Sequence, residues 1–197
     1  MNRYENPILK PAMTKEELQE LPAFNHPGRF VLIETIPEAL KAIEELKKAT
    51  HIGFDTETRP SFQKGEFYHV ALLQLATLEC CYLFRLTKVS FSDSLVSILE
   101  DENIIKVGVG IRDDVIGLQK LQEFTPRGFL DLSEKTRISR SISLSLRSLC
   151  GMYLGQRLLK GAKITNWEAP VLTDAQAKYA ANDAFVSLLI MEKMFNA

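Results

Sequence analysis

Apolar and polar residues follow two different periods along this chain, and each period predicts one kind of element. Runs rich in β-branched and aromatic residues predict strands over residues 29–34, 51–57, 68–77, 80–84 and 104–109. Apolar residues spaced by three and four predict one helix that opens with Pro37 and another over 93–100, which Ser92 could cap. Thr173 and Gln176 form a capping pair at the start of a long last helix. From Asp113 onward the pattern is mostly helical.

The order of these elements predicts the fold class and the domain organisation. Strands and helices alternate, so we expect an α/β domain with a mixed central sheet flanked by helices. A short turn joins the strands at 68–77 and 80–84 into an antiparallel hairpin, and a helical crossover reaches the later strand at 104–109. Residues 1–26 are rich in proline, and we expect an N-terminal arm with one helical turn, followed by a single domain over 27–197.

Composition excludes several classes of protein. Hydrophobic residues make up 46% and charged residues 25%, a balance that excludes global disorder. No apolar run approaches the roughly 18 residues that a membrane-spanning helix needs, and the first residues lack the apolar stretch of a secretory signal. We therefore expect a cytoplasmic protein with no membrane partner. Cys80, Cys81 and Cys150 show no CxxC spacing, so we expect reduced thiols rather than disulfides or a zinc knuckle.

The first candidate chemistry is a pair of acids at the end of the second predicted strand. Asp55 and Glu57 are two residues apart, so their side chains share one face of the strand. Two carboxylates on one face repel each other unless a positive charge lies between them, and a divalent metal ion supplies such a charge. The alternative is a strand end in solvent, where acids are common.

Two further acidic positions follow later in the chain. Asp113 and Asp114 come just after the strand at 104–109, where α/β folds place functional groups. Either residue could cap the next helix or face a site. Tyr179 and Asp183 are four residues apart on the last helix and share a face, although a solvated aspartate is the alternative there. Small side chains on that helix allow another element to approach its backbone closely: Ala180, Ala181 and Ala184.

Together these positions provide four carboxylates when one of Asp113 and Asp114 faces the site. Mg²⁺ and Mn²⁺ prefer oxygen ligands. Two such ions about 3.5–4 Å apart can clamp the attacking and the leaving oxygen of a phosphoryl transfer. The acids therefore indicate a two-metal site for phosphate chemistry.

Three motifs in this sequence resemble those of the DEDDy 3'-5' exonucleases, most closely the ribonuclease D and Werner-type branch. They occupy residues 54–58, 106–114 and 179–184, and the resemblance covers about residues 29–195. A tyrosine four residues before the last aspartate marks the y-branch. The resemblance implies a ribonuclease H-like fold. It also implies an enzyme that removes nucleoside 5'-monophosphates from a free 3' end of DNA or RNA by two-metal-ion phosphodiester hydrolysis.

The resemblance also implies a role for each residue of the motifs. Asp55, Glu57 and Asp183 would hold a first Mg²⁺ or Mn²⁺ ion. Asp55 would bridge to a second ion, which Asp114 would assist from the second motif. Tyr179 would orient the attacking water, because a phenol with a pKa near 10 is a poor base at neutral pH.

Basic and aromatic residues outside the motifs are the candidates for contact with nucleic acid. The net charge is -1, yet residues 131–167 hold seven lysines and arginines against two acids. Such a basic segment suits a phosphate track, and a solvated helix face is the alternative. The candidates from it are Arg137, Arg140, Arg147, Lys160 and Lys163. The loop at 58–67 adds Arg59 and Lys64 for phosphates and Phe62 and Phe67 for base stacking, although we favour packing of both phenylalanines under the loop.

Two other functions stay open at this point. One is a non-catalytic nuclease-like module that binds nucleic acid or a protein partner without cutting. The other is a small-molecule phosphohydrolase with the same metal site. Intact acids at every motif position favour an active enzyme, and the basic segment favours a polymer as the substrate. Trp167 is expected to pack in the core and to position the last helix.

Overall fold

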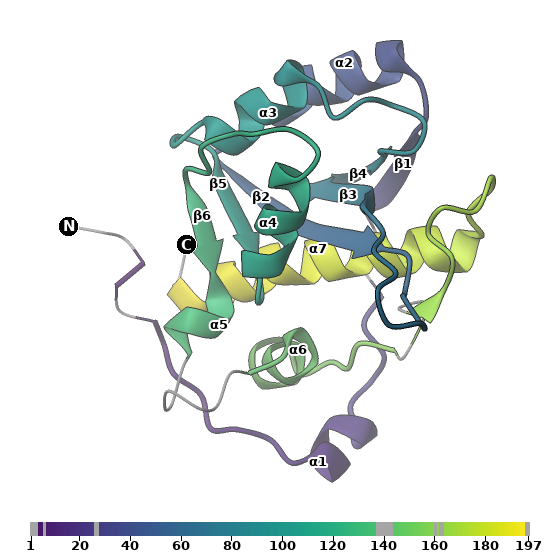
Figure 1. Cartoon of the computed structure of the whole chain (residues 1–197). Helices are drawn as coiled ribbons and strands as arrows, with labels where there is room; N and C mark the ends of the chain where they lie inside the picture. The colour runs from purple at the N-terminus through teal and green to yellow at the C-terminus, as the bar shows by residue number, and fades with distance from the viewer. Residues whose placement is uncertain are drawn as a thin grey trace.

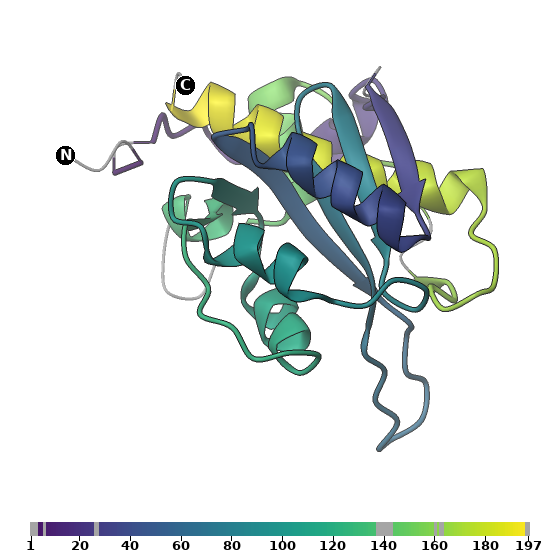
Figure 2. The ribbon, with the colours of Figure 1, turned by 90° about the horizontal axis from the view of Figure 1, so that it is seen from above.

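The computed structural model describes residues 4–5, 7–25, 28–136, 144–159, 161 and 164–195. Within these residues a sheet of six strands lies between two layers of helices (Figures 1 and 2). The strands are β1 (Arg29–Ile33), β2 (His51–Thr58), β3 (Val70–Ala76), β4 (Cys80–Arg85), β5 (Ile105–Gly108) and β6 (Phe129–Asp131). The helices are α1 (Lys15–Glu20), α2 (Ile36–Leu46), α3 (Asp93–Glu100), α4 (Arg112–Gln119), α5 (Leu132–Lys135), α6 (Leu146–Leu154) and α7 (Asp174–Phe195).

The sheet is mixed, as the order of elements predicts. Its strand order is β1-β4-β3-β2-β5-β6. Strands β2, β3 and β4 form an antiparallel meander, and the expected hairpin is its β3–β4 half. Strands β1, β5 and β6 join it in parallel. The segment from Asp113 onward is mostly helical, as predicted, but it also contains β6, which was missed from the sequence because a strand of three residues is too short to show a period.

Local capping explains where the main helices begin. Thr35 and Glu38 form a capping box at the start of α2, with proline in its first turn. Thr173 and Gln176 exchange the two reciprocal hydrogen bonds of the predicted box before α7. Ser92 occupies the capping position of α3, but its side chain makes no capping hydrogen bond, which corrects that part of the prediction.

The two faces of the sheet are covered by different helices. Helices α2, α3 and α4 pack on one face through a core that includes Ile43, Leu99 and Leu118. Helices α6 and α7 pack on the other face through two further clusters. In β2 the apolar Ile52 and Phe54 point into the first core. Their alternating neighbours in the strand therefore point toward α7.

The N-terminal arm carries the expected helix and packs on the domain. Thr14 caps α1 with a full capping box through Glu17. Along the arm, the Ile8 backbone N–H donates to the Met194 carbonyl of α7 at 2.8 Å. The boundary between arm and domain remains a prediction. Across the described part of the chain, every helix is too short or too polar to traverse a lipid bilayer.

Candidate active site

A close contact between β2 and α7 brings the first and last acidic motifs together. A Cβ atom at Gly53 would collide with the backbone carbonyl oxygen of Ala184, so only glycine allows the helix to lie this close. The small residues on that face of α7, Ala180, Ala181 and Ala184, are all buried, as their size predicts. This packing sets Asp183 on the helix beside Asp55 and Glu57 on the strand.

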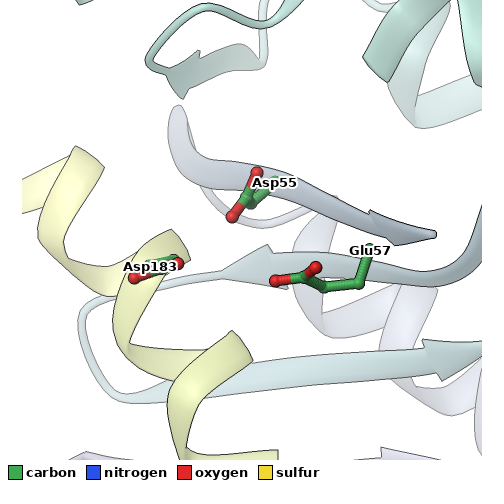
Figure 3. A group of neighbouring side chains, drawn as sticks. All are labelled: Asp55, Glu57 and Asp183. Atoms are coloured by element: carbon green, nitrogen blue, oxygen red, sulfur yellow. The ribbon is translucent and has the colours of Figure 1, made fainter. Parts of the chain in front are cut away.

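The three carboxylates converge on one space. Asp55, Glu57 and Asp183 each offer an oxygen, and these oxygens all lie within 4.8 Å of one another. Figure 3 shows the side chains from the strand and the helix pointing toward a common centre. Glu57 and Asp183 are buried, and Asp55 is half-buried. Three oxygens at this separation can coordinate a single divalent cation.

The electrostatics of this group also fit a metal ion. Desolvation raises the pKa of Asp55 well above its ordinary value, and the negative charges of Asp183, Asp114 and Glu57 raise it further. A hydrogen bond from the Thr56 backbone opposes this shift. Clustered acids of this kind must either bind protons or share a cation. Because the ligands are all carboxylate oxygens, the residues fit a hard ion such as Mg²⁺ or Mn²⁺.

Asp114 lies in the same cleft but outside the group of three. It is in the first turn of α4, and its carboxylate accepts a hydrogen bond from the Thr56 hydroxyl. Burial raises the pKa of Asp114, and the hydrogen bond from Thr56 opposes the rise. Asp113 is exposed and is absent from the residues that line the cleft. Of the two acids left open by the sequence, the geometry therefore favours Asp114.

Two residues that hold Asp114 in place were missed from the sequence. Thr56 lies between the paired acids of β2, where strand alternation turns it toward α4. Asp131, at the end of β6, accepts hydrogen bonds from the backbone N–H groups of Gly110 and Ile111 at 2.9 and 3.1 Å. It thereby fixes the turn that leads into α4. Alternation could have identified Thr56, whereas no spacing rule connects Asp131 with a turn about 20 residues earlier.

Tyr179 stands beside the acids on α7. Burial raises the pKa of its phenol well above the ordinary range, and the charges of Asp183 and Glu57 and a hydrogen bond with Asp183 raise it further. The side chain is therefore a neutral phenol at every physiological pH. Its ring lies 6.3 Å from the ring of Trp167 between centroids. Trp167 is fully buried, which confirms its predicted place in the core.

A buried cation supports the segment before α7. Arg85, at the end of β4, is almost fully buried and donates to the Ala169 carbonyl at 2.5 Å and to the Glu34 carboxylate at 3.2 Å. Ala169 follows the segment that carries Trp167. Arg85 therefore holds in place the chain that packs against Tyr179. An isolated arginine at a strand end carries no sequence signal for this role.

The acids open into a cleft with a volume of about 680 Å³. One side is formed by the acids of β2 and α7 together with Asp114. A second part of the lining, here called the α6 wall, consists of the chain that enters α6 and the chain that leaves it: Leu144, Ser145, Leu146, Arg147, Leu158 and Leu159. Arg147 is thus a predicted nucleic-acid contact that does line the cleft.

The predicted nucleic-acid contacts on the loop at 58–67 differ in their exposure and in their partners. Phe62 and Phe67 are 80% and 89% exposed, so our interpretation that both pack under the loop is wrong. The loop between β2 and β3 projects away from the sheet, as Figure 2 shows, so it carries both residues away from the apolar core. Arg59 pairs with Glu168 at 3.3 Å and lies 4.5 Å from the centroid of the Tyr68 ring. Lys64 is exposed on the same loop.

Four predicted cations cannot be placed. They lie outside the described residues: Arg137, Arg140, Lys160 and Lys163.

Known proteins resemble this chain over nearly its whole length. A family model described as 3'-5' exonuclease matches residues 30–197. The Mus musculus bifunctional 3'-5' exonuclease/ATP-dependent helicase WRN is 32% identical over 198 residues, which cover 95% of this chain and 14% of that protein. A 3'-5' exonuclease of Arabidopsis thaliana is 30% identical over 185 residues, which cover 86% of this chain and 64% of that protein. The chain thus spans less than two thirds of either relative.

Solved structures agree with the fold. The structure of Escherichia coli RNase D, an exoribonuclease involved in structured RNA processing, has a TM-score of 0.76 and 25% identity. The match covers 83% of this chain and 44% of that one. The Nibbler EXO domain of Aedes aegypti has a TM-score of 0.75 and 22% identity and covers 90% of this chain and 91% of that one. These likenesses confirm the predicted ribonuclease H-like fold.

Proposed function

Because the chain belongs to the 3'-5' exonuclease family, we propose that it removes nucleoside 5'-monophosphates one at a time from the 3' end of DNA or RNA. The observation that carries this proposal is the convergence of Asp55, Glu57 and Asp183 within 4.8 Å at the floor of an open cleft. Buried carboxylates that repel one another destabilise a fold unless a bound cation compensates. Their presence therefore supports a working metal site.

We infer that the site takes two Mg²⁺ or Mn²⁺ ions. Asp55, Glu57 and Asp183 would hold the first ion, and Asp55 and Asp114 would reach the second. When bound, such ions lower the pKa of water and stabilise negative charge on the phosphate and on the departing oxygen. The hydroxyl of Thr56 would keep Asp114 turned into the cleft.

The residues of the chain itself orient the reaction. Tyr179 keeps its proton, so it acts as a hydrogen-bonding group that orients the attacking water and not as a base. The water loses a proton to solvent and its oxygen forms a bond to phosphorus, while the bond from phosphorus to the 3' oxygen of the preceding nucleotide breaks and that oxygen takes up a proton. The products are a nucleoside 5'-monophosphate and a chain one nucleotide shorter with a new 3'-hydroxyl group.

The substrate would enter along the cleft, beside the α6 wall. Arg147 lines this path and can neutralise a phosphate. Phe62 and Phe67 are exposed and therefore available to stack on bases. Arg59 is partly engaged by Glu168, so we expect it to contribute less.

We also place the enzyme in the cytoplasm. Cys80, Cys81 and Cys150 are buried free thiols, which supports a reducing compartment.

A labelled oligonucleotide tests this function. The protein is incubated with a 5'-labelled strand as single-stranded DNA, as recessed duplex DNA and as RNA, each with Mg²⁺ or Mn²⁺. We expect a ladder that shortens from the 3' end and that disappears when a chelator removes the metal. An intact strand that is still retained by the protein would instead support the non-catalytic binding module.

Replacing Tyr179 by phenylalanine is expected to leave weak activity. The ring still packs against Trp167, but the hydroxyl that orients the water is gone. Loss of the group that orients a reactant typically lowers the rate about 100-fold. Single-turnover rates on the labelled strand measure the effect, with Tyr82→Phe, in a half-buried tyrosine of β4, as the control. Full activity in Tyr179→Phe would remove the hydroxyl from the mechanism.

A further inference from the structure

Residues 7–25 of the N-terminal arm lie before the region that matches the exonuclease family at residues 30–197. They nevertheless pack against the elements that form one wall of the active-site cleft. In Figure 1, α6 lies between α1 of the arm and the sheet. Two separate contacts join the arm to this wall.

The first contact is between helices α1 and α6. A Cβ atom at Gly151, in the middle of α6, would collide with the Leu18 side chain of α1. The same atom would lie 3.2 Å from Leu21 and 3.4 Å from the sulfur of Met13. Three apolar side chains of the arm therefore sit directly on the backbone of α6. Glycine makes this close approach possible.

The second contact is a short parallel backbone pairing between Ala23 and Arg157. The Arg157 N–H donates to the Pro22 carbonyl at 2.9 Å, and the Phe24 N–H donates to the Arg157 carbonyl at 2.8 Å. The Arg157 side chain adds a bond from its Nε to the Leu21 carbonyl at 2.8 Å. Phe24 is buried in the apolar cluster that also contains side chains of α6, and it anchors the pairing there.

Both contacts hold chain that continues directly into the cleft. The residues before and at the start of α6 line the cleft, and so do Leu158 and Leu159, which follow Arg157. Arg147 lies on this wall, one helical turn before Gly151. The described residues of the arm lie behind the wall, and none of them lines the cleft.

We propose that the arm is a substrate-positioning element that holds the α6 wall, on which the polymer lies 5' to the bond that is cut. This inference rests on the proposed exonuclease function. The arm supports the path of the polymer and leaves the carboxylate group untouched. Loosening it should weaken the binding of an oligonucleotide and spare the hydrolysis of a small phosphodiester that reaches only the acids.

Gly151→Ala is the variant that tests this role. Alanine favours the helix more than glycine does, so α6 itself is not weakened, while the new methyl group takes the place of the end of the Leu18 side chain and displaces that side chain from α6. Leu18→Ala in the same chain makes room for that methyl group and should restore the contact. Leu18 is half-buried, and Leu18→Asp should detach α1 because a charge is costly to bury in this contact. Hydrogen exchange at the Phe24 and Arg157 amides reports whether the arm is attached.

Each protein is given a 5'-labelled oligonucleotide and, separately, the p-nitrophenyl ester of thymidine 5'-monophosphate. We expect Gly151→Ala and Leu18→Asp to speed amide exchange and to raise KM for the oligonucleotide about 5- to 10-fold with little change in kcat. Hydrolysis of the ester should stay within about twofold of wild type, and the double variant should recover oligonucleotide binding.

The possible results distinguish a failure of the arm's proposed role from a failure of the proposed exonuclease function. A detached arm with an unchanged KM for the oligonucleotide overturns the inference, as does an equal loss on both substrates, which would mark a general loss of structure. If the Phe24 and Arg157 amides stay protected in both Gly151→Ala and Leu18→Asp, the contact between Gly151 and Leu18 does not hold the arm, and the inference is overturned. Wild-type protein that shortens no oligonucleotide overturns the proposed function and takes this inference with it.

Discussion

Replacing Asp183 by asparagine is expected to lower exonuclease activity by roughly 10³-fold or more. The change keeps the size of the side chain and removes one of the three charges that converge within 4.8 Å. A site with one carboxylate fewer attracts a divalent ion less strongly and no longer fixes it at the reacting phosphate. Single-turnover cleavage of the 5'-labelled oligonucleotide in excess Mg²⁺ or Mn²⁺ measures the loss.

A matched control separates this effect from a general change of charge. Asp174→Asn removes the same charge from the same helix, but Asp174 is exposed in the first turn of α7. Its activity should stay within about twofold of wild type, because exposed substitutions rarely disturb a fold. Circular dichroism confirms that both variants are folded. Full activity in Asp183→Asn, or in Asp55→Ala, would remove the site assignment.

The local geometry of the acids could be predicted from the sequence because it depends on short-range periods. Alternation along a strand puts Asp55 and Glu57 on one face, and a spacing of four puts Tyr179 beside Asp183. Neither period says that the strand and the helix meet. The contact between Gly53 and Ala184 creates that meeting, and it joins segments more than a hundred residues apart. The family resemblance supplied this tertiary fact.

Other features escaped prediction because their causes are tertiary. Phe62 and Phe67 look like core residues by composition, yet their loop projects beyond the sheet and leaves them exposed. Asp131 fixes the turn before α4 through β6, a strand too short for a period to show. The arm carries a recognisable helix, but its partner, the backbone at Gly151, lies far along the chain.

Removing the metal is expected to make the stability of the fold depend on pH, and adding it back is expected to stabilise the protein strongly. Desolvation and then the neighbouring acids raise the pKa of Asp55 in the folded state, whereas an aspartate in the unfolded chain has a pKa of about 3.9. The folded protein therefore holds this proton more tightly than the unfolded chain does. This proton stabilises the fold fully at a pH below the pKa of the unfolded chain. The stabilisation is lost as the pH rises through the raised pKa of the folded state.

Asp55→Asn isolates this contribution from the other carboxylates of the chain. Asparagine carries no proton to lose, so in chelator the free energy of unfolding of the variant should exceed that of wild type by an amount that grows from pH 4 toward neutrality. Urea titrations across this range measure the difference.

With metal the order should reverse. An ion at about 100 times its Kd adds about 2.7 kcal/mol to the free energy of unfolding of a protein that binds it only when folded. For a chain of this size that is a rise of roughly 5–10 °C in Tm. Wild type should show this rise with Mg²⁺ or Mn²⁺, and Asp55→Asn should lose most of it, because Asp55 belongs to the carboxylate group that would hold the ion. Equal Tm values for wild type with and without metal would mean that the acids tolerate one another by taking up protons, and the metal-dependent mechanism would then fail at its first step.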